Sequence, residues 1–482
     1  MIVSMKKTWV TLLCVTVLAG CSTAAKPTDQ EAGPIKWGPC VDLAGFDGQP
    51  TKPDPAMQCG TIPVPLDYAE PDGEQIDMAL IRTRAVGSRL GSLVFNFGGP
   101  GVSGVDNLSP DAFSVLGSRY DLVGFDPRGV ERSAGVRCGG QVGNLLASKD
   151  GPQAERLLKE FADACRRDSG KVLPHVGTVN AARDLDRIRA ALGDERLNYF
   201  GFSYGTHLGA VYATRFPKKV GRFVLDAPFD PTVSFGERAV TQAAGFGRAF
   251  AAFAEDCVAR GCELGDDPGA VKRAVENLVD GLKSEPLKVG DRMLTYGLAQ
   301  LAVLAALYSE DSWSMLEEGA ATALKGDGST LLELADLYTG RKPDGGYSTA
   351  MSSLQAVNCA DTTERPTAAQ VAEINRKIEK IFPFMAGDAA RPCAYWPVPG
   401  SDEAKKIDAT GSAPIVVIGG KGDPATPYKW ATALDAQLKT GVLVTYEGGG
   451  HGAYNNACVT RVVDKYLLDG QVPAEGTTCP AA

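Results

Sequence analysis

The sequence predicts an α/β fold, in which a mostly parallel, doubly wound sheet carries a helical segment inserted between two strands. Three observations predict it. Apolar runs rich in β-branched residues recur along the chain, with helical patterns between them. This alternation stops between about residues 230 and 413, where Ala, Leu and charged residues follow helical spacing. One apolar run ends in a G-x-S-x-G turn at residues 201–205, which is typical of a strand-to-helix junction.

The strand candidates are short apolar runs, and several are nearly continuous, as expected for strands that are buried on both faces. Helical patterns at residues 154–164, 179–192 and 206–215 lie between them. Strands that alternate with helices favour parallel pairing, because each helix returns the chain to the start of the next strand. The expected strands span residues 76–83, 93–97, 122–125, 197–201, 223–225, 415–419 and 442–446.

The chain has 482 residues, enough for a large core and an inserted subdomain. We expect residues 36–230 and 413–482 to form the core, and residues 231–412 to form the helical insertion. An insertion that leaves the carboxyl edge of a parallel sheet would cover a site at that edge as a cap. A separate domain without a catalytic role is the alternative.

The first 21 residues resemble a bacterial export signal. Lys6 and Lys7 precede a short apolar run at residues 8–18, and Leu18-Ala19-Gly20-Cys21 resembles a lipobox. We expect Cys21 to become the lipid-modified first residue, followed by a polar tether at residues 22–35. An ordinary cleaved signal peptide is the alternative. The protein is then exported and either anchored by lipid to the outer face of the cell membrane or secreted, without other membrane contact.

Cysteine use agrees with export. Cys14 and Cys21 belong to the leader, and ten of the twelve cysteines remain. An even number in an exported chain indicates disulfides, although the sequence alone does not determine the pairing. Zinc binding is the rival, but the chain has three histidines and no C-x-x-C pair, so neither a metal nor a cofactor is predicted. Short spacings suggest the pairs Cys40–Cys59, Cys138–Cys165, Cys257–Cys262, Cys359–Cys393 and Cys458–Cys479.

The composition is that of a globular enzyme, with 44% hydrophobic and 22% charged residues. The net charge of −9 and the lack of a basic cluster argue against a nucleic-acid partner. The sequence does not indicate an oligomeric state.

Ser203 is the candidate nucleophile. It lies at the centre of the G-x-S-x-G turn, where glycines on either side relieve steric crowding. The turn lifts the hydroxyl clear of the sheet. It also places the serine at a helix N-terminus, whose free N–H groups stabilise a developing negative charge.

A serine nucleophile needs a base, and His451 is the best of three candidates. His207 lies one helical turn past Ser203 and is expected to pack beneath the turn, and His175 precedes the serine in the chain. In folds with this turn, the carboxylate and then the histidine follow the serine. His451 follows the last expected strand, within a run of glycines that allows close approach to Ser203.

The base needs a carboxylate that orients its ring and stabilises its charged form. Asp423 follows the expected strand at residues 415–419 and shortly precedes the histidine. Asp226 is the competitor, because it also follows a strand. Asp423 is favoured, because it lies between the insertion and His451 in the chain.

Acyl transfer also requires hydrogen-bond donors for the oxyanion. The backbone N–H of Tyr204 is one candidate. The second is the N–H of Gly99, in the glycine-rich turn at residues 98–101 after an early strand. A plain Gly/Pro turn is the alternative.

Five motifs occur in order: Gly-Gly-Pro-Gly at 98–101, Gly-Phe-Asp-Pro-Arg-Gly at 124–129, Gly-Phe-Ser-Tyr-Gly at 201–205, Gly-Asp-Pro-Ala-Thr-Pro at 422–427 and Gly-His-Gly at 450–452. In this order they resemble the α/β-hydrolase serine exopeptidases of the prolyl-aminopeptidase clan. The nearest likeness, over residues 36–480, is to secreted tripeptidyl aminopeptidases of actinobacteria and their mycobacterial cell-envelope lipoprotein relatives. The family's triad positions fall on Ser203, Asp423 and His451. Relatives often carry histidine where this chain has Phe97.

The resemblance implies that short peptides, expected to be tripeptides, are released from the free N-terminus of peptide substrates through an acyl-enzyme. Such an enzyme must recognise the substrate's ammonium group, and Glu237 and Asp361 are the candidates, with ordinary solvated acids as the alternative for each. Two other functions stay open. One is a carboxylesterase with the same triad, and the other is a non-catalytic binding protein on a hydrolase scaffold.

Overall fold

A computed structural model describes residues 34–41, 43, 51–52, 54–143, 151–387 and 393–481, all within one compact unit, Ala32–Ala482. The expected export signal at residues 1–21, including Cys21, and nearly all of the tether at residues 22–35 lie outside the described residues. In the described part of the chain, no helix combines the length and the apolar character needed to cross a membrane.

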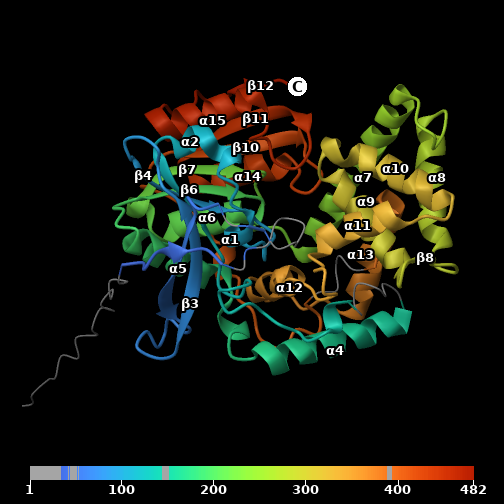
Figure 1. The fold of residues 1–482 in the computed structure, drawn as a ribbon, viewed down its shortest axis with the longest axis horizontal. Helices are drawn as coiled ribbons and strands as arrows, with labels where there is room; N and C mark the ends of the chain where they lie inside the picture. Colours follow the sequence, from blue (N-terminus) through green and yellow to red (C-terminus); the bar gives the residue numbers. More distant parts are fainter. Residues whose placement is uncertain are drawn as a thin grey trace, which may run out of the picture. The chain divides into compact units, whose positions relative to one another are not determined.

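A ten-stranded sheet organises the described residues (Figure 1). Its strand order is β1-β2-β3-β5-β4-β6-β7-β10-β11-β12. The strands are β1 (Gly38–Pro39), β2 (Gln58–Pro65), β3 (Gln75–Thr83), β4 (Gly91–Asn96), β5 (Tyr120–Phe125), β6 (Leu197–Phe202), β7 (Val220–Asp226), β10 (Ile415–Gly422), β11 (Gly441–Gly449) and β12 (Thr478–Cys479).

The predicted mostly parallel sheet is confirmed. Every neighbouring pair from β5 to β12 is parallel. The edge formed by β1, β2 and β3 is antiparallel, and β3 also runs antiparallel to β5. At this edge the sequence predicts β3 but neither β1 nor β2, and it does not predict that β3 is antiparallel.

Two apolar clusters cover the two faces of the sheet. In β4, Val94 belongs to one cluster, whereas Leu93 and Phe95 belong to the other, as the two-residue period of a strand requires. The cluster of Val94 includes α5 (Thr178–Ala191), α6 (Tyr204–Arg215) and α14 (Lys429–Leu438). The other includes α2 (Ser114–Gly117) and α15 (Ala457–Asp469). Figure 1 shows α2 and α15 above the sheet and α5 and α6 below it.

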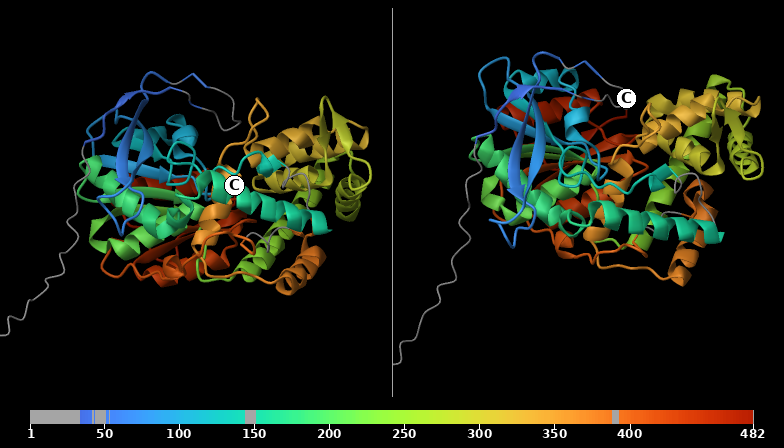
Figure 2. Two further views of the ribbon diagram at one scale, coloured as in Figure 1. Left: turned by 90° about the horizontal axis from the view of Figure 1, so that it is seen from below. Right: turned by 60° about the horizontal axis from the view of Figure 1, so that its bottom comes forward.

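Between β7 and β10 the chain is mainly helical, in the interval where the strand pattern stops. This part, which we call the inserted segment, groups beside the sheet in Figures 1 and 2. Its first helix begins at Phe235, because the side chain of Ser234 accepts the N–H of Glu237, and ends at Arg260, before Gly261 with φ 74°. The helices are α7 (Phe235–Arg260), α8 (Pro268–Gly281), α9 (Tyr296–Leu307), α10 (Trp313–Leu324), α11 (Ser329–Thr339), α12 (Ala350–Ala360) and α13 (Ala368–Ile381), with a hairpin of β8 (Leu287–Val289) and β9 (Arg292–Leu294).

Helices outside the inserted segment include α1 (Gly104–Asn107) and the long α4 (Gly151–Ser169). Disulfides join the described cysteines in the pairs that the short spacings suggested: Cys40–Cys59, Cys138–Cys165, Cys257–Cys262, Cys359–Cys393 and Cys458–Cys479. One of these pairs binds α4 to the loop after β5, and another lies at the end of α12.

Candidate active site

Ser203 occupies the sharp turn between β6 and α6. Its backbone has φ 54° and ψ −120°, a conformation that is strained for a residue other than glycine. Both flanking glycines are required by close packing. A Cβ at Gly201 would lie 2.4 Å from the carbonyl oxygen of Gly205, and one at Gly205 would lie 2.6 Å from that of Asn96. The predicted sharp strand-to-helix turn is therefore present, and it holds Ser203 at the first turn of α6.

His451 and Asp423 form a hydrogen-bonded pair. Nδ1 of His451 lies 3.0 Å from each carboxylate oxygen of Asp423. Asp423 follows β10 and His451 follows β11, so neighbouring parallel strands bring the two side chains together. Oδ1 of Asp423 also accepts the N–H groups of Ala425 and Thr426, and its Oδ2 accepts the Thr426 hydroxyl. The carboxylate is 1% exposed, and its partners fix it toward the imidazole.

Asp226 does not contact the imidazole but links its loop to the serine turn. The backbone carbonyl of Asp226 accepts the N–H of Ser203 at 3.0 Å. Its carboxylate accepts the N–H groups of Ala453 and Tyr454, just after His451, at 2.9 Å each. Burial raises the pKa of this carboxyl to about 6, against the opposing effect of the two N–H donors. Asp226 therefore links the turn that carries Ser203 to the loop that carries His451.

The inserted segment holds His451 from the other side. The N–H of His451 donates to the carbonyl of Tyr308 at 2.8 Å, and the Tyr308 ring lies edge-on to the imidazole at 5.3 Å. Neither ring nitrogen of His451 forms a hydrogen bond with the hydroxyl of Ser203 among the contacts of the described residues. Bonds between a nucleophile and its base often tighten only in the complex with substrate.

The surroundings of His451 predict how the activity falls at low pH. Burial lowers the pKa of the imidazole, but the carboxylates of Asp423 and Asp226 raise it, and the net shift is upward from 6.5. A protonated imidazole cannot take the serine proton, so we expect kcat/KM to fall as the pH falls through this raised pKa. A pH profile of kcat/KM with an amide substrate checks this. A midpoint below 6.5 would contradict it.

Two backbone N–H groups beside Ser203 are unused. The N–H groups of Gly99 and Tyr204 have no hydrogen-bond acceptor among the described residues, and both residues line the same cavity as Ser203. Gly99 has φ +101°, and a Cβ there would lie 2.8 Å from the N atom of Gly101. A Cβ at Gly98 would lie 2.9 Å from the Cβ of Ser203. The glycine-rich turn therefore lies directly against the nucleophile.

The cavity at Ser203 has a volume of about 350 Å³ and is lined mainly by apolar side chains of the inserted segment. Its core side includes Thr426, which contacts Asp423. Asp361 lines the cavity, as the sequence analysis anticipated, but its carboxylate is bound to Thr178. Glu237 does not line it and is exposed to solvent, so the structure does not bring this candidate to the cavity. The cavity also holds Arg238, Glu364 and Lys405, which the sequence analysis missed.

The helical period explains why Arg238 of α7 lines the cavity and Glu237 does not. Phe235, Arg238, Ala239 and Gln242 line the cavity at spacings of three and four residues, whereas Glu237 lies on another face. The apolar residues at positions 235, 239, 243 and 246 already mark the buried face in the sequence. That signal could have identified Arg238 and excluded Glu237.

The other two histidines have structural surroundings. His207 is buried, and its Nε2 lies 2.8 Å from the carbonyl oxygen of Ala404, while burial lowers the pKa of the ring. The carbonyl of His175 accepts a hydrogen bond from Arg128. Phe97, at the position where relatives often carry histidine, stacks on Phe202 with ring centroids 6.0 Å apart.

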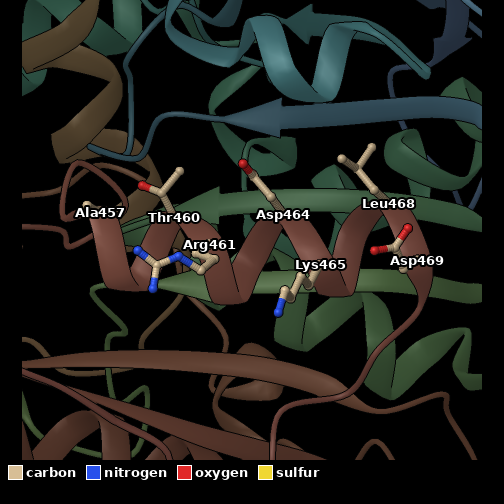
Figure 3. A pocket seen from close by; sticks show the side chains of 7 residues that line it. All are labelled: Ala457, Thr460, Arg461, Asp464, Lys465, Leu468 and Asp469. Carbon is tan, nitrogen blue, oxygen red and sulfur yellow. The ribbon is translucent and has the colours of Figure 1, made fainter.

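A second hollow, of about 410 Å³, lies along α15 (Figure 3). All seven lining residues come from that one helix, and none is a predicted site residue. Within the described residues, no group of three or more His, Cys, Asp or Glu side chains could hold a metal ion.

Comparison with known proteins agrees with this arrangement. A family described as alpha/beta hydrolase fold matches residues 91–266, and one described as TAP-like protein matches residues 382–479. "Serine protease Hip1" of Mycobacterium tuberculosis (strain ATCC 25618 / H37Rv) is 38% identical, over 97% of this chain and 94% of that protein. "Carboxylesterase B" of the same strain is 37% identical, over 88% and 86% of the two chains. "Tripeptidyl aminopeptidase" of Streptomyces lividans is 33% identical, over 92% and 86%.

The three relatives align over 88% to 97% of this chain. Of the two family matches, the first contains Ser203 and the second contains Asp423 and His451. They confirm the resemblance stated from the five sequence motifs. The chain belongs to the α/β-hydrolase family, among its members with a TAP-like C-terminal region.

Proposed function

We propose that the protein is a serine peptidase that releases short peptides, tripeptides in particular, from the free N-terminus of peptide substrates. The observation that carries the proposal is the pairing of His451 with Asp423, in a loop that Asp226 links to the strained serine turn. Two unused N–H donors lie beside the same serine. The names of two relatives, a serine protease and a tripeptidyl aminopeptidase, support peptides as the substrate class.

The geometry supports an acyl-enzyme mechanism. The hydroxyl oxygen of Ser203 attacks the peptide carbonyl while Nε2 of His451 takes its proton, and Asp423 stabilises the resulting imidazolium. The N–H groups of Gly99 and Tyr204 bind the oxyanion. The C–N bond then breaks as His451 passes the proton to the leaving amine. Water, deprotonated by His451, attacks the acyl-enzyme and releases the N-terminal peptide and free Ser203.

We propose that the inserted segment, residues 231–412, covers this site as a cap. Its helices supply most of the cavity wall, and Tyr308 holds the backbone of His451. Asp361 remains the candidate for the substrate amine, since its carboxylate lines the cavity. A cavity walled by the inserted segment suits an exopeptidase, because the free end of the substrate needs no exit.

Hydrolysis of short acyl esters is the second candidate function, because a relative 37% identical is named a carboxylesterase. The test compares a tripeptide p-nitroanilide, its N-acetylated form and a short acyl p-nitrophenyl ester. The peptidase proposal predicts cleavage of the free tripeptide amide and strong loss on acetylation. Mass spectrometry of products from a defined longer peptide gives the number of residues removed. Ester cleavage without any amide cleavage would leave the esterase as the function.

We propose further that the protein is exported and held to the outer face of the cell membrane through a lipid on Cys21. Disulfides among the described cysteines fit an oxidising compartment.

Cys21→Ala is expected to move the protein from the membrane fraction to the soluble exported fraction, because the chain then lacks a lipid attachment site. Cell fractionation with immunodetection measures this. Cys14→Ala is the matched control, since it removes a cysteine from the same leader and should leave the distribution unchanged. Unchanged membrane association of Cys21→Ala would contradict the anchor.

A further inference from the structure

The cavity beside Ser203 holds two acidic side chains, and both already have hydrogen-bond donors. The two carboxylate oxygens of Asp361 accept the N–H and the hydroxyl of Thr178, at 2.8 and 2.5 Å. One oxygen of Glu364 accepts the N–H of Phe235, and the other accepts from a lysine. The oxygens of both acids therefore already accept hydrogen bonds from the protein itself, and Glu364 is also paired with a lysine.

The cavity is also lined by one lysine and one arginine, and of these Lys405 is fully used. Its ammonium group lies 2.7 Å from Asp402, 3.2 Å from Glu364 and 3.1 Å from the hydroxyl of Thr362. A lysine has three N–H donors, so these three acceptors use all of them.

Arg238 differs from the other three charged groups. Its Nη1 donates to the side-chain oxygen of Asn358 at 3.2 Å, and the guanidinium has no other hydrogen-bond acceptor and no ion pair among the described residues. A guanidinium carries five N–H donors, so four remain unused. The group also lies over two aromatic rings, 4.3 Å from the centroid of Phe235 and 5.4 Å from that of Phe229. The rings and Asn358 hold it in place at the cavity wall.

The guanidinium is partly buried and stays charged. Burial lowers the pKa of Arg238 to about 10, while Glu364 and Asp361 act in the opposite direction without contacting it. A charge that loses water without gaining a partner is unfavourable, and a carboxylate with two oxygens fits the fork of a guanidinium. The ligand that best satisfies this group is therefore an anion with paired oxygens.

We propose that Arg238 binds the carboxylate of an Asp or Glu side chain in the released part of the peptide, and so makes the enzyme prefer acidic N-terminal peptides. This inference rests on the proposed peptidase function. The released part is the one that must fit inside the cavity, because the remainder of the substrate is long and has to extend into solvent. Ser203 and Arg238 line the same cavity, so an acyl group on the serine lies in the space that Arg238 faces.

The test uses tripeptidyl aminomethylcoumarin substrates that carry Glu or Gln at one of the three positions and Ala at the others. Glu and Gln have nearly the same shape, so the ratio of their kcat/KM values reports charge recognition alone. A charge-assisted hydrogen bond predicts a ratio of roughly ten or more at one position. Arg238→Gln should reduce this ratio to about one, and Arg238→Lys to an intermediate value.

Arg248→Gln is the matched control, because it removes the same charge from an exposed position of the same helix. This variant should keep the wild-type ratio. A wild-type enzyme without a Glu preference at any position overturns the inference. So does an equal loss for Glu and Gln substrates in Arg238→Gln, because that result assigns the guanidinium to a main-chain carbonyl.

A binding measurement tests this inference separately from the peptidase proposal. It does not require that the Arg238 variants cleave a substrate. Isothermal titration of the Ser203→Ala variant with the free Glu and Gln tripeptides gives the ratio of their Kd values. Tighter binding of the Glu peptide, lost on adding Arg238→Gln, supports the inference even where no peptide amide is cleaved. Equal Kd values overturn it, whether or not neutral peptides are cleaved. If Arg238→Gln fails to fold, Arg238→Lys takes its place in both measurements.

Discussion

Ser203→Ala is expected to lower kcat by roughly a million-fold, because no other group can form the acyl-enzyme. The fold should survive the change. The hydroxyl of Ser203 has no hydrogen-bond partner among the described residues, so its removal leaves no buried group unsatisfied. Turnover of a tripeptide amide measures the first effect, and thermal unfolding followed by circular dichroism measures the second.

A fluorophosphonate probe adds a test that does not depend on the substrate. The wild-type protein should be labelled at Ser203, and Ser203→Ala should not be labelled. Labelling of Ser203 also separates an enzyme from a non-catalytic protein with a hydrolase scaffold. Undiminished turnover in Ser203→Ala, or wild-type protein that resists the probe, would contradict the assignment of the nucleophile.

Asp423→Asn is expected to lower kcat by about four orders of magnitude. In the native protein Oδ1 of Asp423 accepts two backbone N–H groups, so the amide nitrogen of Asn would take the place of Oδ2. An N–H donor would then lie as close to Nδ1 of His451 as the remaining oxygen, and it favours the tautomer in which Nδ1 is the acceptor. The ring proton moves to Nε2, and Nε2 can no longer take the proton of Ser203. Steady-state kinetics with a tripeptide amide measure the loss.

Asp226→Asn is the comparison that tests which carboxylate serves the histidine. This residue contacts the backbone after His451 and not the ring, and an Asn retains one acceptor oxygen for Ala453 and Tyr454. We expect a loss on the order of 10- to 100-fold, the effect of a weakened charge-assisted hydrogen bond. The acid limb of kcat/KM should also move to lower pH, because a negative charge that raises the pKa of His451 is removed. A larger loss for Asp226→Asn than for Asp423→Asn would reverse the two roles.

The local features of the site could be predicted from short stretches of sequence. The serine turn requires small residues because β4 passes so close that a Cβ at Gly205 would lie 2.6 Å from the Asn96 carbonyl oxygen. Gly99 reaches φ +101°, a backbone conformation that glycine adopts readily. In both places the local geometry requires glycine, so the sequence motif by itself predicts the geometry.

Contacts between distant segments were harder to anticipate. Asp226 and Asp423 both follow buried strands, and the sequence did not show that one carboxylate reaches the ring of His451 while the other binds the backbone beyond it. Tyr308 lies 143 residues before His451 and still fixes its N–H. Glu237 carries the expected charge near the boundary of the inserted segment, but its position on α7 places it away from the cavity.

By itself, the sequence determined the parallel core and the serine turn, and it predicted the order of nucleophile, acid and base, because these depend on periodic burial and on backbone conformations that few residues adopt. Tertiary structure alone decided the antiparallel edge of β1 to β3, the linking role of Asp226, and that the buried face of α7 lines the cavity beside Ser203. Those outcomes depend on how whole helices and strands pack. A helix places neighbouring residues 100° apart around its axis, so a shift of one position exchanges an exposed carboxylate for a guanidinium at the cavity wall.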